Sequence, residues 1–189
     1  MTYFSFLMLL PLLPLMIIPG SLLAGNAVIG PEAGSLHQSL RHSGPPESPE
    51  AAIRSLYDLV TFPAGTSPDW EAVRNLFIPE AVIVLRSSRT AQSVFSVDGF
   101  VQDFVNFIER AEVIKTGFEE KIVSVRLTEF GDIAHAFVIY EARIPGKMPR
   151  PQTGVDSFQL IRQDGVWKIA SIINELPGPD RPVPEAIRN

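Results

Sequence analysis

The stretch DSFQLIRQDGVWKIASIINE, residues 156–175, decides the fold, because it predicts two strands joined at Asp164-Gly165. Both central positions of a type I′ turn need positive φ, which aspartate and glycine tolerate. A two-residue turn there pairs Gln163 with Val166, and the alternation of the strands then sorts the side chains into two faces. The face expected to point inward consists of Asp156, Phe158, Leu160, Arg162, Trp167, Ile169, Ser171 and Ile173.

The opposite face of this hairpin is more mixed. It consists of Val155, Ser157, Gln159, Ile161, Lys168, Ala170, Ile172 and Asn174. Its apolar members are poorly suited to water, and packing this face against its own copy would bury them symmetrically. A homodimer through the sheet is therefore expected.

Asp156 is the unusual member of the inward face. An ionised carboxylate among apolar side chains is costly unless it is paired, so either its pKa is raised or a partner such as Arg162, Tyr57 or a ligand group satisfies it. Tyr57, His135 and Asn174 are the candidate hydrogen-bond partners, and Asn174 needs a β-bulge to reach the same face. The alternative to a functional site is a structural pair at the rim of the sheet.

The chain before this hairpin predicts helices and further strands. Helical spacing of apolar residues, with caps at Ser48 and Ser67, predicts helices over 48–60 and 67–77, and a third over 96–112. Strands are expected over three ranges: 81–87, 121–129 and 133–144. This order predicts an α+β domain in which three N-terminal helices pack on a curved, mainly antiparallel sheet.

Composition excludes several classes of function. A net charge of −5 with scattered basic residues offers no surface for nucleic acid. The chain has no cysteine, so disulfides and thiolate metal sites are excluded. His37 and His42 lie in a Gly-, Pro- and Ser-rich stretch that is poorly suited to hold a metal. No phosphate-binding loop or serine-nucleophile motif is present, so neither a metal nor a cofactor is predicted.

The first 25 residues are nearly all apolar and predict a signal peptide or an N-terminal anchor. Three prolines interrupt the run, which favours a cleaved signal over a membrane-spanning helix. The protein is therefore expected to be exported, to the periplasm or outside the cell, with membrane contact only through this segment if it is uncleaved. Behind it we expect a flexible linker over 26–48, a domain over 49–177 and a tail over 178–189.

Two stretches resemble the nuclear transport factor 2-like superfamily, which includes SnoaL-like cyclases, ketosteroid isomerase and scytalone dehydratase. They are DWEAVRNLFIPEAVIVLR, residues 69–86, and DGVWKIAS, residues 164–171. The resemblance spans Pro49 to Leu176 and implies a cone-shaped, cystatin-like fold with a pocket between helices and sheet, and frequent dimers through the sheet. Its members include enzymes, binding modules and scaffolds, so the fold alone does not choose a function.

Residue by residue, the resemblance supports one position well. The general base of ketosteroid isomerase would fall at Leu85, so that base is missing here. Asp156 aligns with a ligand-contacting amide of scytalone dehydratase, and the isomerase carries an acid on the equivalent strand. Tyr57 lies one position from the tyrosine of the isomerase's oxyanion pair. His135 alternates with Phe137 on a central strand and is the remaining catalytic candidate.

These observations predict a domain that binds a small apolar organic ligand. The expected ligand-binding residues are Phe137, Phe158, Trp167 and Ile169. One alternative is an enzyme of the isomerase, cyclase or dehydratase kind, with Asp156 as acid or base and Tyr57 or His135 as its partner. The other is a dimeric interaction module whose cavity is filled, and the volume of the pocket separates it from the first two.

Overall fold

The computed structural model describes residues 44–188 of the chain. The predictions for the apolar segment, for most of the linker and for His37 and His42 lie outside the described residues. The elements in chain order are α1 (Pro49–Val60), β1 (Phe62–Pro63), α2 (Trp70–Asn75), β2 (Phe77–Arg86), β3 (Gln92–Phe95), α3 (Val97–Arg110), β4 (Gly117–Phe130), β5 (Ile133–Arg143), β6 (Gln152–Gln163) and β7 (Val166–Glu175), with short 3₁₀ turns at Val113–Lys115 and Glu185–Ile187.

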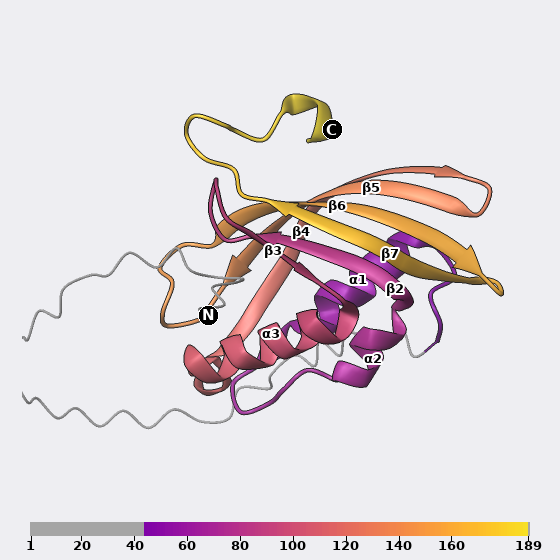
Figure 1. Ribbon diagram of the computed structural model, residues 1–189. Helices are drawn as coiled ribbons and strands as arrows, with labels where there is room; N and C mark the ends of the chain where they lie inside the picture. The colour runs from indigo at the N-terminus through magenta and orange to yellow at the C-terminus, as the bar shows by residue number, and fades with distance from the viewer. Residues whose placement is uncertain (1–43, 189) are drawn as a thin grey trace, which may run out of the picture.

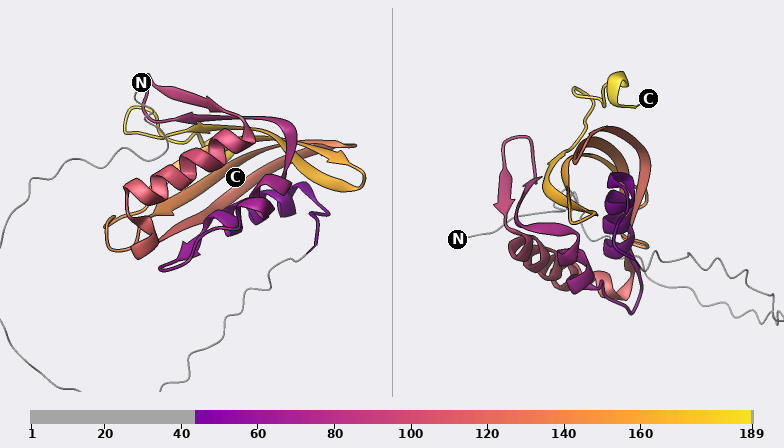
Figure 2. Two further views of the ribbon diagram at one scale, coloured as in Figure 1. Left: turned by 60° about the horizontal axis from the view of Figure 1, so that its bottom comes forward. Right: turned by 90° about the vertical axis from the view of Figure 1, so that its right-hand side faces the viewer.

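The strands form one curved sheet in the order β1-β4-β5-β6-β7-β2-β3. Strands β2 and β7 run parallel, and the other described neighbours pair antiparallel. The helices lie on the concave side of this sheet, with α1 and α3 inside its curve (Figures 1 and 2). The structure is thus α+β, with three helices and a mainly antiparallel sheet as predicted.

The three helices begin where polar side chains can cap them. Ser48 Oγ accepts a hydrogen bond from the backbone N–H of Ala51, and Pro49 occupies the first turn, as the sequence predicted. The cap of α2 is Asp69, which accepts from Ala72, so the prediction of Ser67 was wrong. A capping carboxylate is favoured there because it also faces the positive end of the helix dipole.

Two short strands were not predicted from the sequence. Strand β3 pairs with β2 through Val84 and Val94, and it precedes α3, so short strands alternate with the helices. Strand β1 has two residues and pairs with the start of β4. Runs this short carry too little periodicity to be distinguished from loops.

The β6–β7 hairpin matches the prediction near its turn and departs from it further along. Gln163 pairs with Val166 and Leu160 with Ile169, but Gln159 pairs with Ser171, so Ala170 is an extra residue on β7. A β-bulge of this kind reverses the faces of every residue beyond it. The predicted pairing of Asp156 with Ile173 was therefore wrong, and Asp156 pairs with Asn174.

The reversal exchanges buried and exposed residues at the end of β7. Ile172 and Asn174, expected on the outer face, are each 4% exposed, whereas Ile173, expected inside, is 51% exposed. The core between sheet and helices contains several fully buried aromatic side chains: Phe104, Phe118, Phe158 and Trp167. Asn174 and Asp103 are the buried polar or charged residues of the described part of the chain.

Candidate functional site

A hydrogen bond between helix α1 and strand β6 is at the centre of the candidate site. Tyr57 Oη donates to Asp156 Oδ2 at 2.6 Å, across 99 residues of sequence. Tyr57 lies on the inward face of α1 and is 3% exposed, and Asp156 is partly buried on the inner face of β6. Burial raises the pKa of Asp156 to about 7, although hydrogen bonds from Tyr57 and Asn174 act in the opposite direction.

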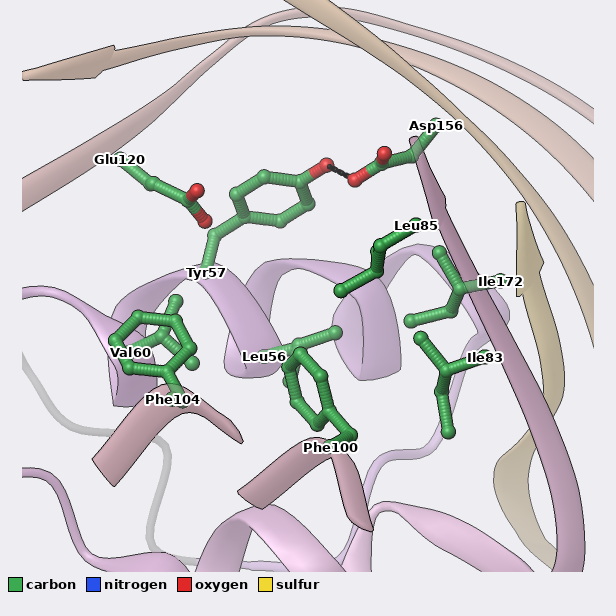
Figure 3. A pocket seen from close by; sticks show the side chains of 10 residues that line it. All are labelled: Leu56, Tyr57, Val60, Ile83, Leu85, Phe100, Phe104, Glu120, Asp156 and Ile172. Atoms are coloured by element: carbon green, nitrogen blue, oxygen red, sulfur yellow. Dashed lines mark hydrogen bonds between the residues drawn. The ribbon is translucent and has the colours of Figure 1, made fainter. Parts of the chain in front are cut away.

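A second carboxyl group, that of Glu120 on β4, faces the same space. The ring of Tyr57 lies between Glu120 and Asp156 (Figure 3). Burial, together with the charge of Asp156, raises the pKa of Glu120 to about 8. Thr61, the C-cap of α1, fixes the backbone of Glu120: its Oγ1 donates to the carbonyl of Glu120 at 3.1 Å and accepts from its N–H at 2.9 Å.

Asn174 completes the polar cluster from strand β7. Its Oδ1 accepts a hydrogen bond from the backbone N–H of Arg86 at 3.0 Å, and its Nδ2 donates to Tyr140 Oη at 3.1 Å. A backbone N–H can only donate, so the amide orientation is determined and the NH₂ group faces Tyr140 and Asp156. Burial raises the pKa of both Tyr57 and Tyr140, so both phenols stay protonated at neutral pH.

Tyr57, Glu120 and Asp156 border a small cavity whose other walls are apolar. Its volume is about 30 Å³. The lining residues are Leu56, Tyr57, Val60, Ile83, Leu85, Phe100, Phe104, Glu120, Asp156 and Ile172 (Figure 3). A water molecule needs roughly 10–15 Å³ and a drug-sized ligand roughly 300–1,000 Å³. The cavity therefore admits a water molecule or the functional group of a ligand, and a larger molecule requires the walls to move.

The structure brings together Asp156 and Tyr57 and places the third catalytic candidate elsewhere. His135 lies on the outer face of β5, between the buried Ala134 and Ala136, so its expected place in the pocket was wrong. Its Nε2 lies 3.2 Å from Ser157 Oγ, on the outer face of β6.

The four predicted ligand-binding residues do not line this cavity. Phe137 is on the outer face, where its ring meets that of His135 edge to face. Phe158, Trp167 and Ile169 point inward as expected but are packed into the core. Phe158 packs against the ring of Tyr57, with centroids 6.4 Å apart, and so helps to fix the position of that ring.

Arg162, a candidate partner of Asp156, is occupied at the far end of the hairpin. Its guanidinium pairs with Asp132 at 2.6 Å and lies over the ring of Trp167, 5.7 Å from the centroid. It therefore covers Trp167 at the turn end of the hairpin. In residues 44–188 no group of three or more histidine and acidic side chains could hold a metal ion, and no helix there is long and apolar enough to cross a membrane.

Glu120 and Tyr140 were not identified from the sequence. The predicted strand began at Lys121, one residue too late to include Glu120. Strand β4 begins at Gly117, and its alternation places Glu120 on the same face as the buried Phe118.

Comparison of the sequence with protein-family models and with curated proteins gives no match. Comparison of the structure with solved structures gives many. A protein from Streptomyces avermitilis, named as a dehydratase of the nuclear transport factor 2-like family, shares 16% identity at a TM-score of 0.52. The match covers 67% of this chain and 91% of that one.

Two further structures have the same TM-score of 0.52 and 12% identity. One, from Novosphingobium aromaticivorans, is named as a scytalone dehydratase, with 68% of this chain and 81% of that one covered. The other, from Thiobacillus denitrificans, is named as a calcium/calmodulin-dependent protein kinase type II association domain, with 69% and 96% covered. The names differ in class although the architecture is shared. The chain therefore has the cystatin-like fold that these nuclear transport factor 2-like structures share, which is the fold that the resemblance implied.

Proposed function

We propose that this domain binds a small organic molecule through an oxygen-bearing group and catalyses proton transfer on it, as an enzyme of the isomerase, cyclase or dehydratase kind. The observation that carries the proposal is the 2.6 Å hydrogen bond from Tyr57 to Asp156 in an apolar cavity that a second acid also lines. Acid–base catalysis is most effective when the pKa of the catalytic group is near the working pH. Both acids have pKa values raised into that range.

The class of ligand follows from the lining of the cavity. Apolar walls favour an apolar body, and two carboxyl groups disfavour an anion, so the expected ligand is a neutral molecule with a carbonyl or hydroxyl group. The 30 Å³ cavity holds that group alone. Side chains at binding sites commonly change rotamer when a partner binds, so the body of the ligand is expected to displace apolar wall residues.

The test is a comparison of the wild type with Asp156→Asn on enones, hydroxylated ring ketones and polyketide-like aromatics. The variant should lose roughly 10²–10⁴-fold in turnover, the usual contribution of a positioned acid or base. Asp164→Asn, in the exposed hairpin turn, is the matched control and should retain activity. Equal turnover by wild type and Asp156→Asn would remove Asp156 from catalysis.

A second function, a dimeric interaction module without a ligand, is favoured by the small cavity and by the outer face of the sheet. A row of paired residues crosses that face: Val94, Val84, Ile173, Ser157 and Phe137. Val94 is 65% exposed and Ile173 51%, so this row presents apolar side chains that a partner could cover.

Light scattering separates this function from a monomeric enzyme. A dimer through the sheet should dissociate in Ile173→Asp and persist in Ile114→Asp, which adds the same charge at an exposed residue of a 3₁₀ turn. A monomeric wild type at micromolar concentration would contradict the dimer. A dimer that Ile173→Asp leaves intact would place the interface elsewhere.

Export remains part of the proposal and rests on the apolar segment over residues 1–25. Cell fractionation and N-terminal sequencing of the mature protein test it. A cytoplasmic product that keeps Met1 would contradict export.

A further inference from the structure

We propose that the two acids of the site have different roles: Glu120 holds the proton and acts as the acid, and Asp156 is ionised and acts as the base. The assignment of catalytic roles rests on the proposed acid–base function. The location of the proton rests on the geometry alone.

Asp156 is surrounded by hydrogen-bond donors. Tyr57 Oη–H donates to it at 2.6 Å, and the NH₂ group of Asn174 is directed toward it by the bond between Asn174 Oδ1 and the N–H of Arg86. Hydrogen bonds donated to a carboxylate favour its ionised form. Asp156 is thus prepared to accept a proton from a ligand.

Glu120 lacks such donors. In the described part of the chain its carboxyl oxygens accept no hydrogen bond. The two hydrogen bonds between Thr61 and Glu120 involve only the backbone of Glu120. A partly buried carboxyl group without donors or a cation is favoured in its neutral form.

The surroundings allow the pair to hold about one negative charge. The titratable groups that face the two acids are Tyr57 on α1 and Tyr140 on β5, and neither supplies a positive charge. Strand β7 contributes the neutral Asn174, and β2 and α3 contribute apolar side chains to the cavity. Two ionised carboxylates would repel each other in this space, so one proton remains, and the donors around Asp156 place it on Glu120.

In an elimination reaction the two roles combine in one step. Asp156 removes a proton from a carbon atom of the substrate, and Glu120 donates its proton to the leaving hydroxyl group. The C–H and C–O bonds break, a C=C bond forms and water departs, which leaves Asp156 protonated and Glu120 ionised. The starting state returns when Asp156 releases its proton to solvent and Glu120 takes one up.

The location of the proton can be measured without a substrate. Infrared or carbon-13 spectroscopy of the full chain between pH 7 and pH 8, between the pKa values of about 7 for Asp156 and about 8 for Glu120, should detect a protonated carboxyl group whose signal is largely lost in Glu120→Gln and persists in Asp156→Asn. The matched control is Glu119→Gln. Glu119 is adjacent to Glu120 in the sequence but lies on the other face of β4, where its carboxylate pairs with Arg143 at 2.7 Å. Loss of the signal in Asp156→Asn with retention in Glu120→Gln would overturn the assignment, as would a signal that survives both substitutions.

A second variant tests the reason for the difference. Asn174→Ala removes a donor from Asp156, so its titration midpoint should rise by about one pH unit, a tenfold weaker acid. Asn75→Ala, an exposed residue at the end of α2, should leave the midpoint unchanged. An unchanged midpoint in folded Asn174→Ala would contradict the role of Asn174. Failure to find turnover would contradict the proposed function but would not affect either spectroscopic result.

Discussion

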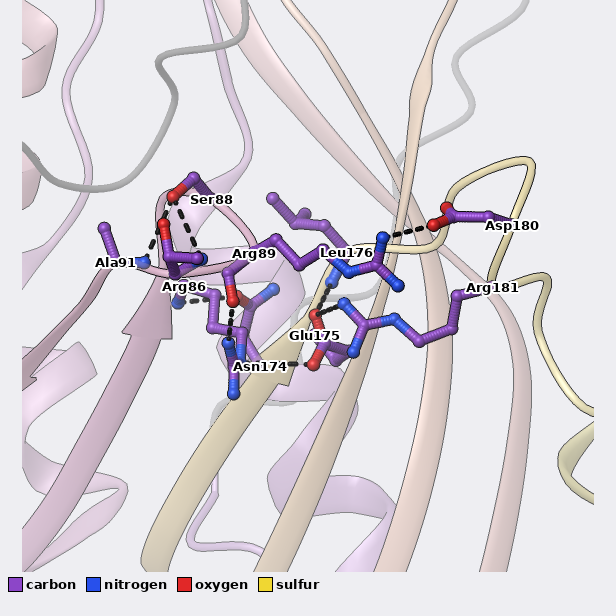
Figure 4. A network of polar contacts seen from close by, with 10 residues as sticks. Arg86, Ser88, Arg89, Ala91, Asn174, Glu175, Leu176, Asp180 and Arg181 are labelled. Carbon is purple, nitrogen blue, oxygen red and sulfur yellow. Dashed lines mark hydrogen bonds and ion pairs between the residues drawn. The ribbon is translucent and has the colours of Figure 1, made fainter.

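Two polar clusters meet at neighbouring residues of β7 and differ in nearly every physical respect. Asn174 points inward to the cluster of Tyr57, Glu120 and Asp156 described above. Glu175 points outward to an ion-pair cluster with Arg86, Arg89, Asp180 and Arg181 (Figure 4). The inner cluster has two acids and no cation, and the outer one alternates acids with arginines.

The same side-chain chemistry therefore behaves differently on the two sides of one strand. In the outer cluster the hydrogen bond from Arg89 lowers the pKa of Asp180. In the inner cluster burial raises the pKa of Asp156 and Glu120. The outer acids thus remain charged and contribute little to stability, whereas burial of the inner acids disfavours their charged forms and so costs stability at neutral pH.

The largest expected effect is a loss of stability as pH rises. The ordinary pKa values of Asp156 and Glu120 are 3.8 and 4.5, and the folded values are about 7 and about 8, so the folded protein binds more protons across this interval. The contribution of these two acids to stability is then fully present below about pH 4 and is lost as pH rises through 8, by about 1.4 kcal/mol per pH unit for each excess proton. Urea denaturation at a series of pH values measures this slope.

Substitution sharpens the same test. Glu120→Gln should flatten the slope between pH 5 and pH 8, because the neutral amide removes one titrating group. Glu119→Gln should leave it unchanged. A wild-type stability that rises over this interval would mean that the inner acids are paired like those of the outer cluster.

The next largest effect is expected at Gly154, where the ring of Tyr140, a hydrogen-bond partner of Asn174, packs on the backbone of β6. A Cβ atom at Gly154 would lie 2.3 Å from the ring of Tyr140, which crosses the strand at this point. Gly154→Ala should therefore cost about 3 kcal/mol and displace Tyr140 from Asn174. Thermal unfolding measures the loss, with Gly178→Ala, in the tail beside the outer cluster, as a control that should be nearly neutral. Similar stability of both variants would show that the packing of Tyr140 is loose.

A smaller effect is expected for Tyr57→Phe. The substitution removes the donor to Asp156 and keeps the ring, so it should cost about 1.5 kcal/mol. The titration midpoint of Asp156, followed by NMR, should rise, because its ionised form loses a hydrogen bond. A midpoint that stays fixed would show that Tyr57 does not set the charge of Asp156.

The smallest effect belongs to the outer cluster. Arg89→Ala breaks the pair with Asp180, in which both side chains are 62% exposed, so the free energy of unfolding should change very little. Any change should vanish in high salt, since salt screens exposed charges. A salt-independent loss comparable to that of Tyr57→Phe would erase the distinction between the two clusters.

The sequence allowed the fold to be predicted because its main signals are local. The Asp164-Gly165 turn, the apolar spacing of α1 and α3 and the alternation of the long strands depend on residues close together in the chain. The position of Asp156 on the inner face was also predictable, since β6 itself is regular. Its bond to Tyr57 was one of several open alternatives.

The rest of the site depends on features that the sequence does not encode locally. The bulge at Ala170 moves Asn174 to the inner face, and no glycine or proline marks it. Glu120 stands beside Glu119, and two adjacent acids indicate an exposed strand end unless the start of the strand is known. The size of the cavity depends on how side chains from α1, α3 and the sheet interlock, which only the packed structure reveals.

The hydrogen bond between Pro46 O and Trp167 N, at 3.1 Å, has a mechanical consequence. It places the start of the described chain at the beginning of β7, whereas the tail departs from the opposite end of the same strand, after Glu175. Strand β7 has ten residues, so its two ends are about 30 Å apart. A pull between the two ends of the domain would run lengthwise along β7, which β2 and β6 flank. Rupture would then require many interstrand bonds to shear together, a geometry that resists force better than peeling one bond at a time.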